Sequence, residues 1–539
     1  MDNSEEKGEK ARELNRPIAD FIVAIKKQLG PESKGEEMPG EGEENIEEAG
    51  ESVAKLYEKV RNLIEYKDDH LIKRNAIERI LKRNLLIELR RGDFSAQFIE
   101  ELAMAGYLDR ALVGDNKKEK TKRAISKYQK TMRLAGGYET KRWLVELASC
   151  EMEEILFPNP IRFALVGAMY RTVRERIIVQ NGGRADGGGN DIRIFLATVK
   201  SIAKADNATL NWALFKIYFP EWMEIAEGAE DEKLRPIAKK LPVLRRDFGK
   251  KIADPVSAKI GVALRKQAVF FNIFYEVALQ NVSKIDKIAA DPESLKFAVQ
   301  LAAGDVYDRE MKKYWKRVKR SLVFLIVTKI FLAAAVEYPY DLYIVGQVAA
   351  LPILVNLFFP PIYLLFLSLT VHRPSDENSA LIAKGVEEIS FGKEKKPIAE
   401  IRAREIETFS DWTLNLFFIL TYGISFGIAV WILRLLDFNW LGVLIFLFLF
   451  SVINFFNALV RQPVRELLVE REKEGMIGML IDTLSMPFVR IGKWMSVNFS
   501  RVNVFIFLFD VIIEAPFKVV IRFIREWAGF IRRKKEEMI

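Results

Sequence analysis

The chain has 539 residues, of which 50% are hydrophobic, and its 82 lysine and arginine residues exceed its 73 aspartate and glutamate residues, giving a net charge of +9. A single cysteine, Cys150, excludes an intrachain disulfide, and two histidines, His70 and His372, are too few for a multi-histidine metal centre. The mean hydropathy near zero averages two different parts, because charges recur every few residues up to position 320 and long uncharged runs follow.

The amino-terminal segment, residues 1–30, predicts a charged start followed by a short amphipathic helix. The first twenty residues carry many charges and no apolar core, so we expect no secretory signal peptide and a cytoplasmic amino-terminal half. Apolar residues at spacings of three and four between positions 13 and 29 predict the helix. Residues 31–51 hold nine glutamates and little to bury, which predicts a disordered acidic tether.

Residues 52–320 predict a helical cytoplasmic domain, because apolar residues recur at helical spacing and no alternating strand pattern competes. Asp291 followed by Pro292 is a typical helix start, and nothing obviously breaks this helix before Val336. The glycine-rich segment 182–191 lacks the spacing of a phosphate-binding loop and is interpreted as a surface loop. Further helices are expected at 119–134, 138–156, 160–180, 191–205, 207–219, 233–240 and 255–283.

Residues 321–460 predict a membrane domain of four spans. The last two are the clearest, each with 21 residues and no charge. The first is slightly short, and the second is longer than needed and contains Pro352, Pro360 and Pro361, which predict a kinked or broken span. The spans are expected at about 321–336, 342–371, 413–433 and 440–460.

Basic residues predict how the spans are oriented. Residues 312–320 hold six basic side chains, 372–409 hold seven and 461–473 hold four, whereas the connections 337–341 and 437–439 hold none. Because basic loops are retained in the cytoplasm, both termini are expected there and two tight hairpins are expected to point outward. The sequence therefore predicts a multi-pass protein of the cell membrane.

The carboxyl-terminal region, residues 461–539, raises a question of placement. Segment 503–523 is apolar enough for a membrane, yet it carries Asp510 and Glu514 one helical turn apart. These carboxylates either line a path for ions or form the wet face of a helix on the membrane surface. A fifth span would leave the basic tail outside, so we expect amphipathic helices on the inner surface, with a re-entrant segment as an alternative.

Polar side chains within the spans are candidates for a pathway, because such residues are costly in a membrane. In the other interpretation, Lys329 snorkels or pairs with a carboxylate, and the asparagines join helices. We favour this interpretation because no predicted span carries an embedded acid. Gly423 and Gly427, four residues apart, are candidates for helix packing, within the bundle or in a homodimer. The pathway or bundle candidates are Lys329, Asn356, Asn415, Asn454, Asn457, Asp510 and Glu514.

Basic residues at the borders of the membrane are candidates for contacts with anionic lipid headgroups, each contributing about 1 kcal/mol near such a surface. They are Lys312, Lys313, Lys316, Arg317, Lys319, Arg320, Arg532, Arg533, Lys534 and Lys535. A further basic stretch, 117–133, holds eight basic residues and is of a kind that binds RNA or a ribosome. We favour a solvated helix face there and expect no nucleic-acid partner.

No nucleotide-binding loop, serine hydrolase motif, zinc protease motif or pair of cysteine and histidine occurs in the sequence, so we expect neither an enzyme nor a cofactor. The expected fold is all-α: a helical cytoplasmic domain, a four-helix polytopic membrane domain and amphipathic interfacial helices at the carboxyl terminus. The leading function is a non-enzymatic, membrane-anchored binding or scaffold protein with a protein partner or as a homo-oligomer. The alternative is a small channel or transporter that uses the polar span residues and the Asp510/Glu514 pair.

Overall fold

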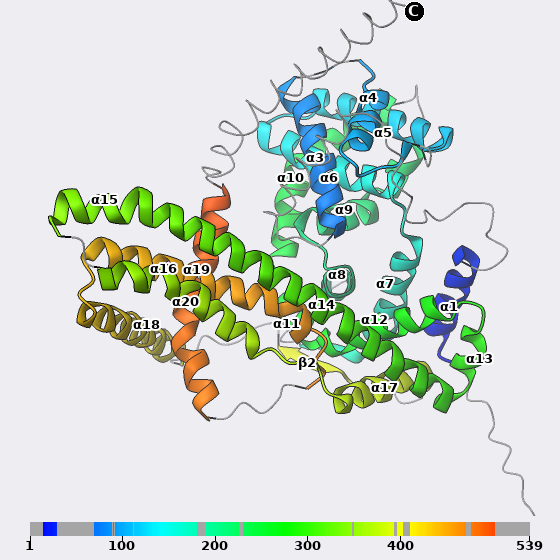
Figure 1. Cartoon of the computed structure of the whole chain (residues 1–539). Helices are drawn as coiled ribbons and strands as arrows, with labels where there is room; N and C mark the ends of the chain where they lie inside the picture. Colours follow the sequence, from blue (N-terminus) through cyan, green and yellow to red (C-terminus); the bar gives the residue numbers. More distant parts are fainter. Residues whose placement is uncertain are drawn as a thin grey trace, which may run out of the picture. The chain divides into compact units, whose positions relative to one another are not determined.

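The structure is a computed structural model in which the chain forms two compact units (Figure 1). From residue 15 onward, unit 1 contains the described residues of Arg265–Gly392 and Arg404–Asp510. Unit 2 contains the described residues of Asn15–Leu264 and Lys393–Ala403. The described residues are 14–29, 69–88, 90, 92–110, 113–180, 189–225, 230–347, 350–392, 396–402, 410–470 and 476–501.

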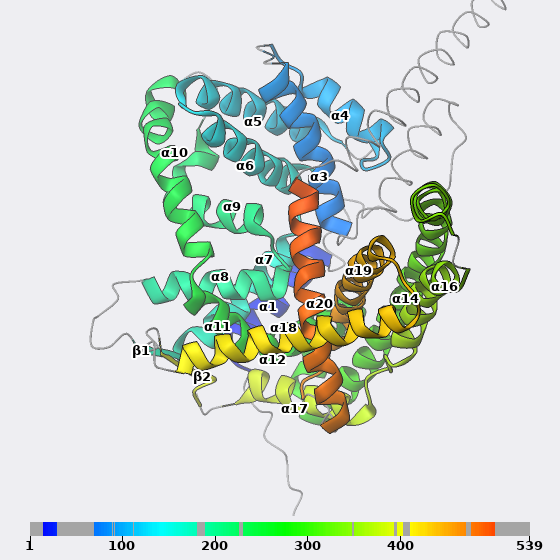
Figure 2. The same cartoon turned by 90° about the vertical axis from the view of Figure 1, so that its left-hand side faces the viewer.

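Unit 2 consists of helices around an aromatic core (Figures 1 and 2). Phe215 lies in this core, and its ring centroid is 6.3 Å from Trp143, 6.0 Å from Trp212 and 5.1 Å from Trp222. Such rings bury large apolar areas and dominate core energetics. The elements are α1 (Arg16–Leu29), α3 (Asp69–Lys82), η2 (Arg83–Ile87), α4 (Ser95–Met104), α5 (Asp115–Leu134), α6 (Tyr138–Leu156), α7 (Pro160–Val173), η4 (Arg174–Arg176), β1 (Ile177–Gln180), α8 (Gly189–Ala203), α9 (Asn207–Tyr218), η5 (Pro220–Glu224), α10 (Glu230–Ile252), α11 (Pro255–Ala263) and β2 (Ala399–Arg402).

Most helices expected in unit 2 are present. The expected helix at 138–156 is α6, and the amphipathic helix near the amino terminus is α1, whose apolar face is buried. The helix expected at 233–240 is much longer, because α10 continues through Pro236 and Pro242, each of which removes only one backbone donor. The single helix expected at 255–283 was wrong, since a turn at Leu264 divides it into α11 and a second helix in unit 1.

The sheet of unit 2 was not predicted. The helix expected at 160–180 ends early, and its last four residues form β1, which pairs in parallel with β2. Arg176, just before β1, donates from Nε to the carbonyl oxygen of Lys396 at 2.9 Å, which fixes the approach to β2. A four-residue strand whose partner lies about 220 residues away leaves no local sequence pattern.

Unit 1 contains the apolar helices together with the helices that precede and connect them. Residues 265–320, which were predicted to belong to the cytoplasmic domain, are part of this unit. Its elements are α12 (Arg265–Gln280), α13 (Ile285–Ala290), α14 (Pro292–Leu332), η6 (Ala333–Glu337), α15 (Tyr338–Tyr340), η7 (Asp341–Val345), α16 (Ala350–Leu369), α17 (Asp376–Phe391), α18 (Ser410–Leu435), α19 (Trp440–Arg465) and α20 (Met476–Arg501).

The long helix of unit 1 begins as predicted but ends later. Asp291 is the N-cap of α14 and its side chain accepts a hydrogen bond from the backbone N of Ser294 at 2.9 Å, with Pro292 in the first turn. Beyond α14, the elements η6, α15 and η7 continue the helical path to Val345, where Gly346 ends it at a φ of 76°. The connection expected at 337–341 was therefore wrong, because it is part of the helix.

Among the described residues of unit 1, three helices are long and apolar enough to cross a membrane, not the four expected. They are α16, residues 416–435 of α18, and α19. The segment expected as the first span belongs to α14, whose last turns include Lys329 and are followed by Glu337 and Asp341. The second expected span, 342–371, is divided near its start, because Gly346 ends the path through η7 and α16 begins at Ala350. The prolines do not divide it, since α16 continues as one helix through Pro360 and Pro361.

Helix α20 packs across α18 and α19 (Figures 1 and 2). The Phe488 ring lies 4.5 Å from that of Phe426 on α18 and 4.7 Å from that of Phe450 on α19. Gly492 lies against Ser451, midway along α19. The expected position of this segment on the inner membrane surface stays a prediction, but its partners are the middles of two apolar helices.

Several expectations lie outside the described residues. These are the acidic tether at 31–51, most of the glycine-rich loop, and segment 503–523 with Asp510 and Glu514. The same holds for the terminal basic candidates Arg532, Arg533, Lys534 and Lys535 and for the side chain of Asn415.

Candidate polar sites of the two units

Lys329 lies at the centre of a buried polar cluster in unit 1. Its Nζ is 3.2 Å from Oε1 of Glu337 and donates to Oδ1 of Asn356 at 2.9 Å. All three side chains are buried, with exposed fractions of 1% for Lys329, 6% for Glu337 and 1% for Asn356. Two of the pathway candidates, Lys329 and Asn356, thus bond to each other, and Lys329 also pairs with a carboxylate that was predicted to lie in a loop.

The Lys329 cluster neutralises a charge inside an apolar part of the molecule. An unpaired buried ammonium group is very unfavourable, whereas a carboxylate together with a neutral acceptor satisfies its donors. The cluster joins the end of α14 and η6 to α16, so it connects two neighbouring helices. This arrangement matches the interpretation in which Lys329 pairs with a carboxylate.

A second polar contact joins α16 to α19. The hydroxyl of Tyr363 donates to Oδ1 of Asn454 at 3.0 Å, and Nδ2 of Asn454 donates to the carbonyl oxygen of Phe450 at 2.8 Å. Asn454 is therefore satisfied on both sides of its amide. Asn457 is also buried on α19, one turn further along the helix.

Polar residues also connect the ends of the apolar helices. At one end, Nδ2 of Asn439 donates to Oδ1 of Asp341 at 2.6 Å, while Oδ1 of Asn439 accepts from the backbone N of Gly442 at 2.7 Å and caps α19. Asp341 begins η7, the last element of the first helical path before Gly346, and Asn439 lies in the turn between α18 and α19. The tips of the two helical hairpins are therefore bonded to each other.

The opposite ends of the helices meet at Asn378, the third residue of α17. Its Nδ2 donates to the hydroxyl of Tyr307 on α14 at 2.7 Å and to the carbonyl oxygen of Leu467 at 2.9 Å. Its Oδ1 accepts from the backbone N of Val469 at 2.9 Å. One side chain thus joins the segment before the first hairpin, the connection between the hairpins and the segment after the second.

The glycines of unit 1 differ in their surroundings. A Cβ added at Gly423 or Gly427 would meet no heavy atom of the described residues within 4 Å, so neither is a point of close approach within the chain. A Cβ at Gly492 would overlap the backbone O of Ser451 and lie 2.7 Å from Cβ of Phe455. The close helix contact is thus at Gly492, and a homodimer contact at the other two stays a prediction.

Three of the basic candidates on α14 line one groove. Lys312, Lys316 and Lys319 share it with Asp308, Met311 and Trp315, and its volume is about 620 Å³. Lys313 faces elsewhere and its Nζ is 3.0 Å from Oε1 of Glu310. Arg317 and Arg320 lie on the same helix outside this lining.

Unit 2 holds an ion pair between α3 and the start of α9, in which Arg74 is buried and the side chain of Asp206 is 39% exposed. Arg74 is 2% exposed, and its Nη1 donates to Oδ1 of Asp206 and to Oγ1 of Thr209, both at 2.6 Å. Asp206 also caps α9, accepting from the backbone N of Thr209 at 3.0 Å. Burial by itself would raise the pKa of Asp206, but the Arg74 guanidinium and the Thr209 donors lower it below its ordinary value.

Two glutamates of α6 lie near this ion pair. Burial and the nearby Glu78 carboxylate raise the pKa of Glu146 to about 7. Burial and the Asp206 and Glu154 carboxylates, opposed by Arg74, raise the pKa of Glu153 to about 7. Both groups therefore change charge near neutral pH.

A second ion pair in unit 2, buried on both sides, involves Lys127 of the basic stretch 117–133. Nζ of Lys127 is 2.7 Å from Oε1 of Glu151 and donates to the carbonyl oxygen of Trp222 at 3.1 Å, while Nε1 of Trp222 donates to Oε2 of Glu151 at 2.8 Å. This closed network joins α5, α6 and η5. One of the eight basic residues that suggested a nucleic-acid surface is therefore part of the core.

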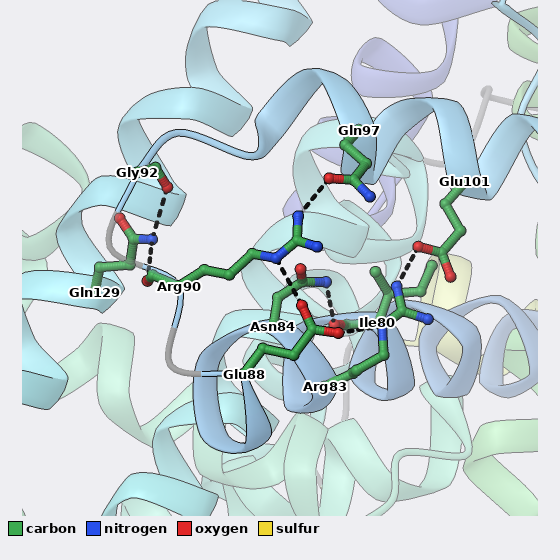
Figure 3. Close-up of polar contacts among 9 residues, drawn as sticks. All are labelled: Ile80, Arg83, Asn84, Glu88, Arg90, Gly92, Gln97, Glu101 and Gln129. Atoms are coloured by element: carbon green, nitrogen blue, oxygen red, sulfur yellow. Dashed lines mark hydrogen bonds and ion pairs between the residues drawn. The ribbon is translucent and has the colours of Figure 1, made fainter.

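Figure 3 shows a third polar network of unit 2, around the π-helical turn η2. Nε2 of Gln129 donates to the carbonyl oxygens of Arg90 at 2.9 Å and Gly92 at 3.1 Å, which fixes the connection between η2 and α4. Arg83 forms an ion pair with Glu101 on α4. These groups join helices to each other, so the network supports the fold.

Several partners in these sites were not predicted from the sequence. They include Glu337, Asp341, Asn439, Tyr363 and Asn378 in unit 1, and Asp206, Glu151 and Trp222 in unit 2. One available signal was a lysine and a glutamate eight residues apart at the border of an apolar run. The other contacts are between distant parts of the chain and leave no local pattern. Comparison of the chain with protein-family models, with curated proteins and with solved structures found no match.

Proposed function

We propose that the protein is a non-enzymatic, multi-pass membrane protein that anchors unit 2 at the inner membrane surface for binding or assembly. The single observation that carries this proposal is the pairing of β1 with β2. The chain leaves unit 1 after α17, supplies β2 to unit 2, and returns to unit 1 at α18. Unit 2 is thus connected to the apolar helices both before α12 and between the two hairpins.

The contacts at the helix ends support four membrane crossings. Among the described residues, three helices are long and apolar enough to cross a membrane by themselves. Tyr307 and Asn378 bond to each other, so the chain between them must run out and back. If α16 crosses the membrane, the antiparallel path through α14, η6 and η7 crosses it too. Pairing of Lys329 with Glu337 removes the net charge that would oppose this crossing.

The positions of the loops support cytoplasmic placement of unit 2 and both hairpin bases. The pairing of β2 with β1 requires the connection between the hairpins to lie on the same side as unit 2. That connection is also rich in basic residues, which favours the cytoplasm. The bonded tips at Asp341 and Asn439 would then face outward.

The rival function, a channel or transporter, is less well supported, because three of the described polar candidates have partners within the bundle. Asp510 and Glu514 lie outside the described residues. Lys329 and Asn356 bond to each other, and Asn454 bonds to Tyr363, so these polar groups join helices. A pathway residue has to exchange partners with the transported species. We therefore interpret these groups as connections within the bundle.

Two measurements test this function in purified, full-length protein. Proteoliposomes should show no ion or solute flux above protein-free liposomes, and a flux that is lost in Lys329→Met/Glu337→Leu would favour the channel instead. Crosslinking in native membranes followed by purification should return a reproducible protein partner or a homo-oligomer. Repeated isolation of an uncrosslinked monomer would count against a binding or assembly role.

A further inference from the structure

The groove on α14 has a composition that suits an anionic lipid headgroup. Its six lining residues occur at spacings of three and four between positions 308 and 319, so they form one face of the helix. The groove offers three lysines to a ligand, and these are exposed. Its volume of about 620 Å³ leaves room for a phosphate and the atoms around it.

The acidic residue in the groove, Asp308, does not neutralise the positive charge of these lysines. Oδ1 of Asp308 accepts from Nε of Arg373 at 2.8 Å, so its charge is already compensated by a residue outside the groove. Among the described residues, no carboxylate pairs with Lys312, Lys316 or Lys319, which therefore give the groove a positive charge. Charge complementarity favours an anionic ligand.

The remaining groove residues place this charge beside apolar surface. Met311 and Trp315 are half-buried and pack against the cluster that includes Tyr314 and Val318. Tyr314 is itself fixed, because its hydroxyl donates to the carbonyl oxygen of Ser368 at 3.1 Å. A tryptophan with its body packed and its edge at a groove is typical of the membrane interface.

The groove ends where the apolar part of α14 begins. Lys319 is two residues before Ser321, the start of the long uncharged run. Lysine side chains at such a border extend toward headgroups while their stems stay on apolar surface. We infer that this groove binds the headgroup of an anionic phospholipid of the inner leaflet through Lys312, Lys316 and Lys319, with Met311 and Trp315 against its glycerol and acyl region.

This inference rests on the proposed membrane location, and it adds a defined site to it. A diffuse attraction to anionic lipid would involve all six basic residues before the apolar run equally. If the groove is the site, Lys316, which lines it, should contribute more than Lys313, which faces Glu310. These two exposed lysines, three residues apart, are a matched pair.

The test uses the full-length protein in detergent, with Lys316→Ala and Lys313→Ala as the variants. Native mass spectrometry measures retention of added phosphatidylglycerol against phosphatidylcholine. Wild-type protein should retain phosphatidylglycerol preferentially, Lys316→Ala should weaken this about fivefold, and Lys313→Ala should match wild type. Equal losses in both variants, or no loss in either, would overturn the groove. Displacement of the lipid by equimolar inorganic phosphate would also overturn it, because the site would then recognise free phosphate.

Extraction of membranes with alkaline carbonate separates this inference from the proposed function. Protein that remains in the membrane but shows no lipid preference contradicts only the groove. Protein that carbonate releases contradicts the anchoring proposal itself, whatever its lipid preference.

Discussion

Both units bury a lysine, and both satisfy it with one carboxylate and one neutral oxygen. In unit 2, Lys127 has Glu151 and the carbonyl oxygen of Trp222. In unit 1, Lys329 has Glu337 and the amide oxygen of Asn356. The common pattern indicates that a buried ammonium group in this protein is a connection between helices, whether the surroundings are a mixed core or apolar helices.

The difference between the two clusters lies in what surrounds them. In unit 2, Trp222 donates back to Glu151 and its ring lies 5.4 Å from that of Tyr128, so charge, hydrogen bonds and aromatic packing are combined. No such third bond to Glu337 is found among the described residues of unit 1. Loss of one carboxylate therefore leaves more groups unsatisfied in unit 2 than in unit 1.

The largest loss of stability is expected for Glu151→Ala. This change leaves Lys127 without its carboxylate and Nε1 of Trp222 without its acceptor, and breaking a buried pair costs about 3–5 kcal/mol. The melting temperature in detergent should fall sharply, with faster trypsin cleavage of unit 2. Glu119→Ala, which removes only the exposed partner of Arg123, should leave both unchanged. Equal effects of the two changes would contradict the importance of the buried network.

A comparable loss of stability is expected for Glu337→Leu, and a second change at Lys329 should restore most of it. It leaves Lys329 buried with Asn356 alone, at a cost of about 3–5 kcal/mol, whereas Lys329→Met/Glu337→Leu replaces both charges with apolar groups and should recover most of the stability. Thermal stability in detergent measures all three proteins. A double variant no more stable than Glu337→Leu would show that the charges do not act as a pair.

A smaller effect tests whether packing also holds unit 1 together. Gly492→Ala forces a Cβ into the backbone of Ser451, and overpacking of this kind costs about 1–3 kcal/mol. A Cβ at Gly423 would meet no heavy atom of the described residues, so Gly423→Ala should leave the melting temperature unchanged or slightly raised, because alanine favours helix. The opposite order would be inconsistent with this packing. Loss of a dimer in Gly423→Ala, seen by size-exclusion chromatography with light scattering, would reveal an interface at that face.

The smallest effect expected is a change with pH in the stability of unit 2. Because the pKa of Glu153 rises from an ordinary 4.5 to about 7 in the folded protein, its contribution to stability is greatest below pH 4.5 and falls as pH rises to about 7. Glu153→Gln should therefore raise the melting temperature by a few degrees at pH 8 and leave it nearly unchanged at pH 4. Glu119→Gln is the exposed control. A benefit that is equal at both pH values would contradict the raised pKa.

Much of the architecture follows from local sequence. The N-cap Asp291 with Pro292 marked the start of α14, and uncharged runs marked α18 and α19. These features depend on neighbouring residues only, so periodicity and capping are sufficient to predict them. The partner of Lys329 was predicted to be a carboxylate, but the residue was not identified.

The remaining features depend on contacts between distant residues. Glu337 was assigned to a loop because charge usually ends an apolar run, whereas in the structure its charge is compensated by Lys329 within the longer helix. The pairing of β1 with β2 and the junction at Asn378 join segments separated by many helices. Gly492 is a single small residue in an ordinary helix, and only the position of α19 makes it a point of close contact.

The central claim is that the two hairpins cross the membrane with bonded tips outside and bases inside. Three single cysteines test it in a Cys150→Ala background: Tyr343→Cys at the first tip, His372→Cys after α16 and Glu466→Cys after α19. All three positions are exposed, and Tyr343 is 82% exposed. The measurement is reaction with a membrane-impermeant maleimide in sealed vesicles of either orientation.

We expect position 343 to react only from outside and positions 372 and 466 to react only from inside. Reaction of positions 343 and 372 from the same side would contradict this topology, because α16 would then not cross the membrane.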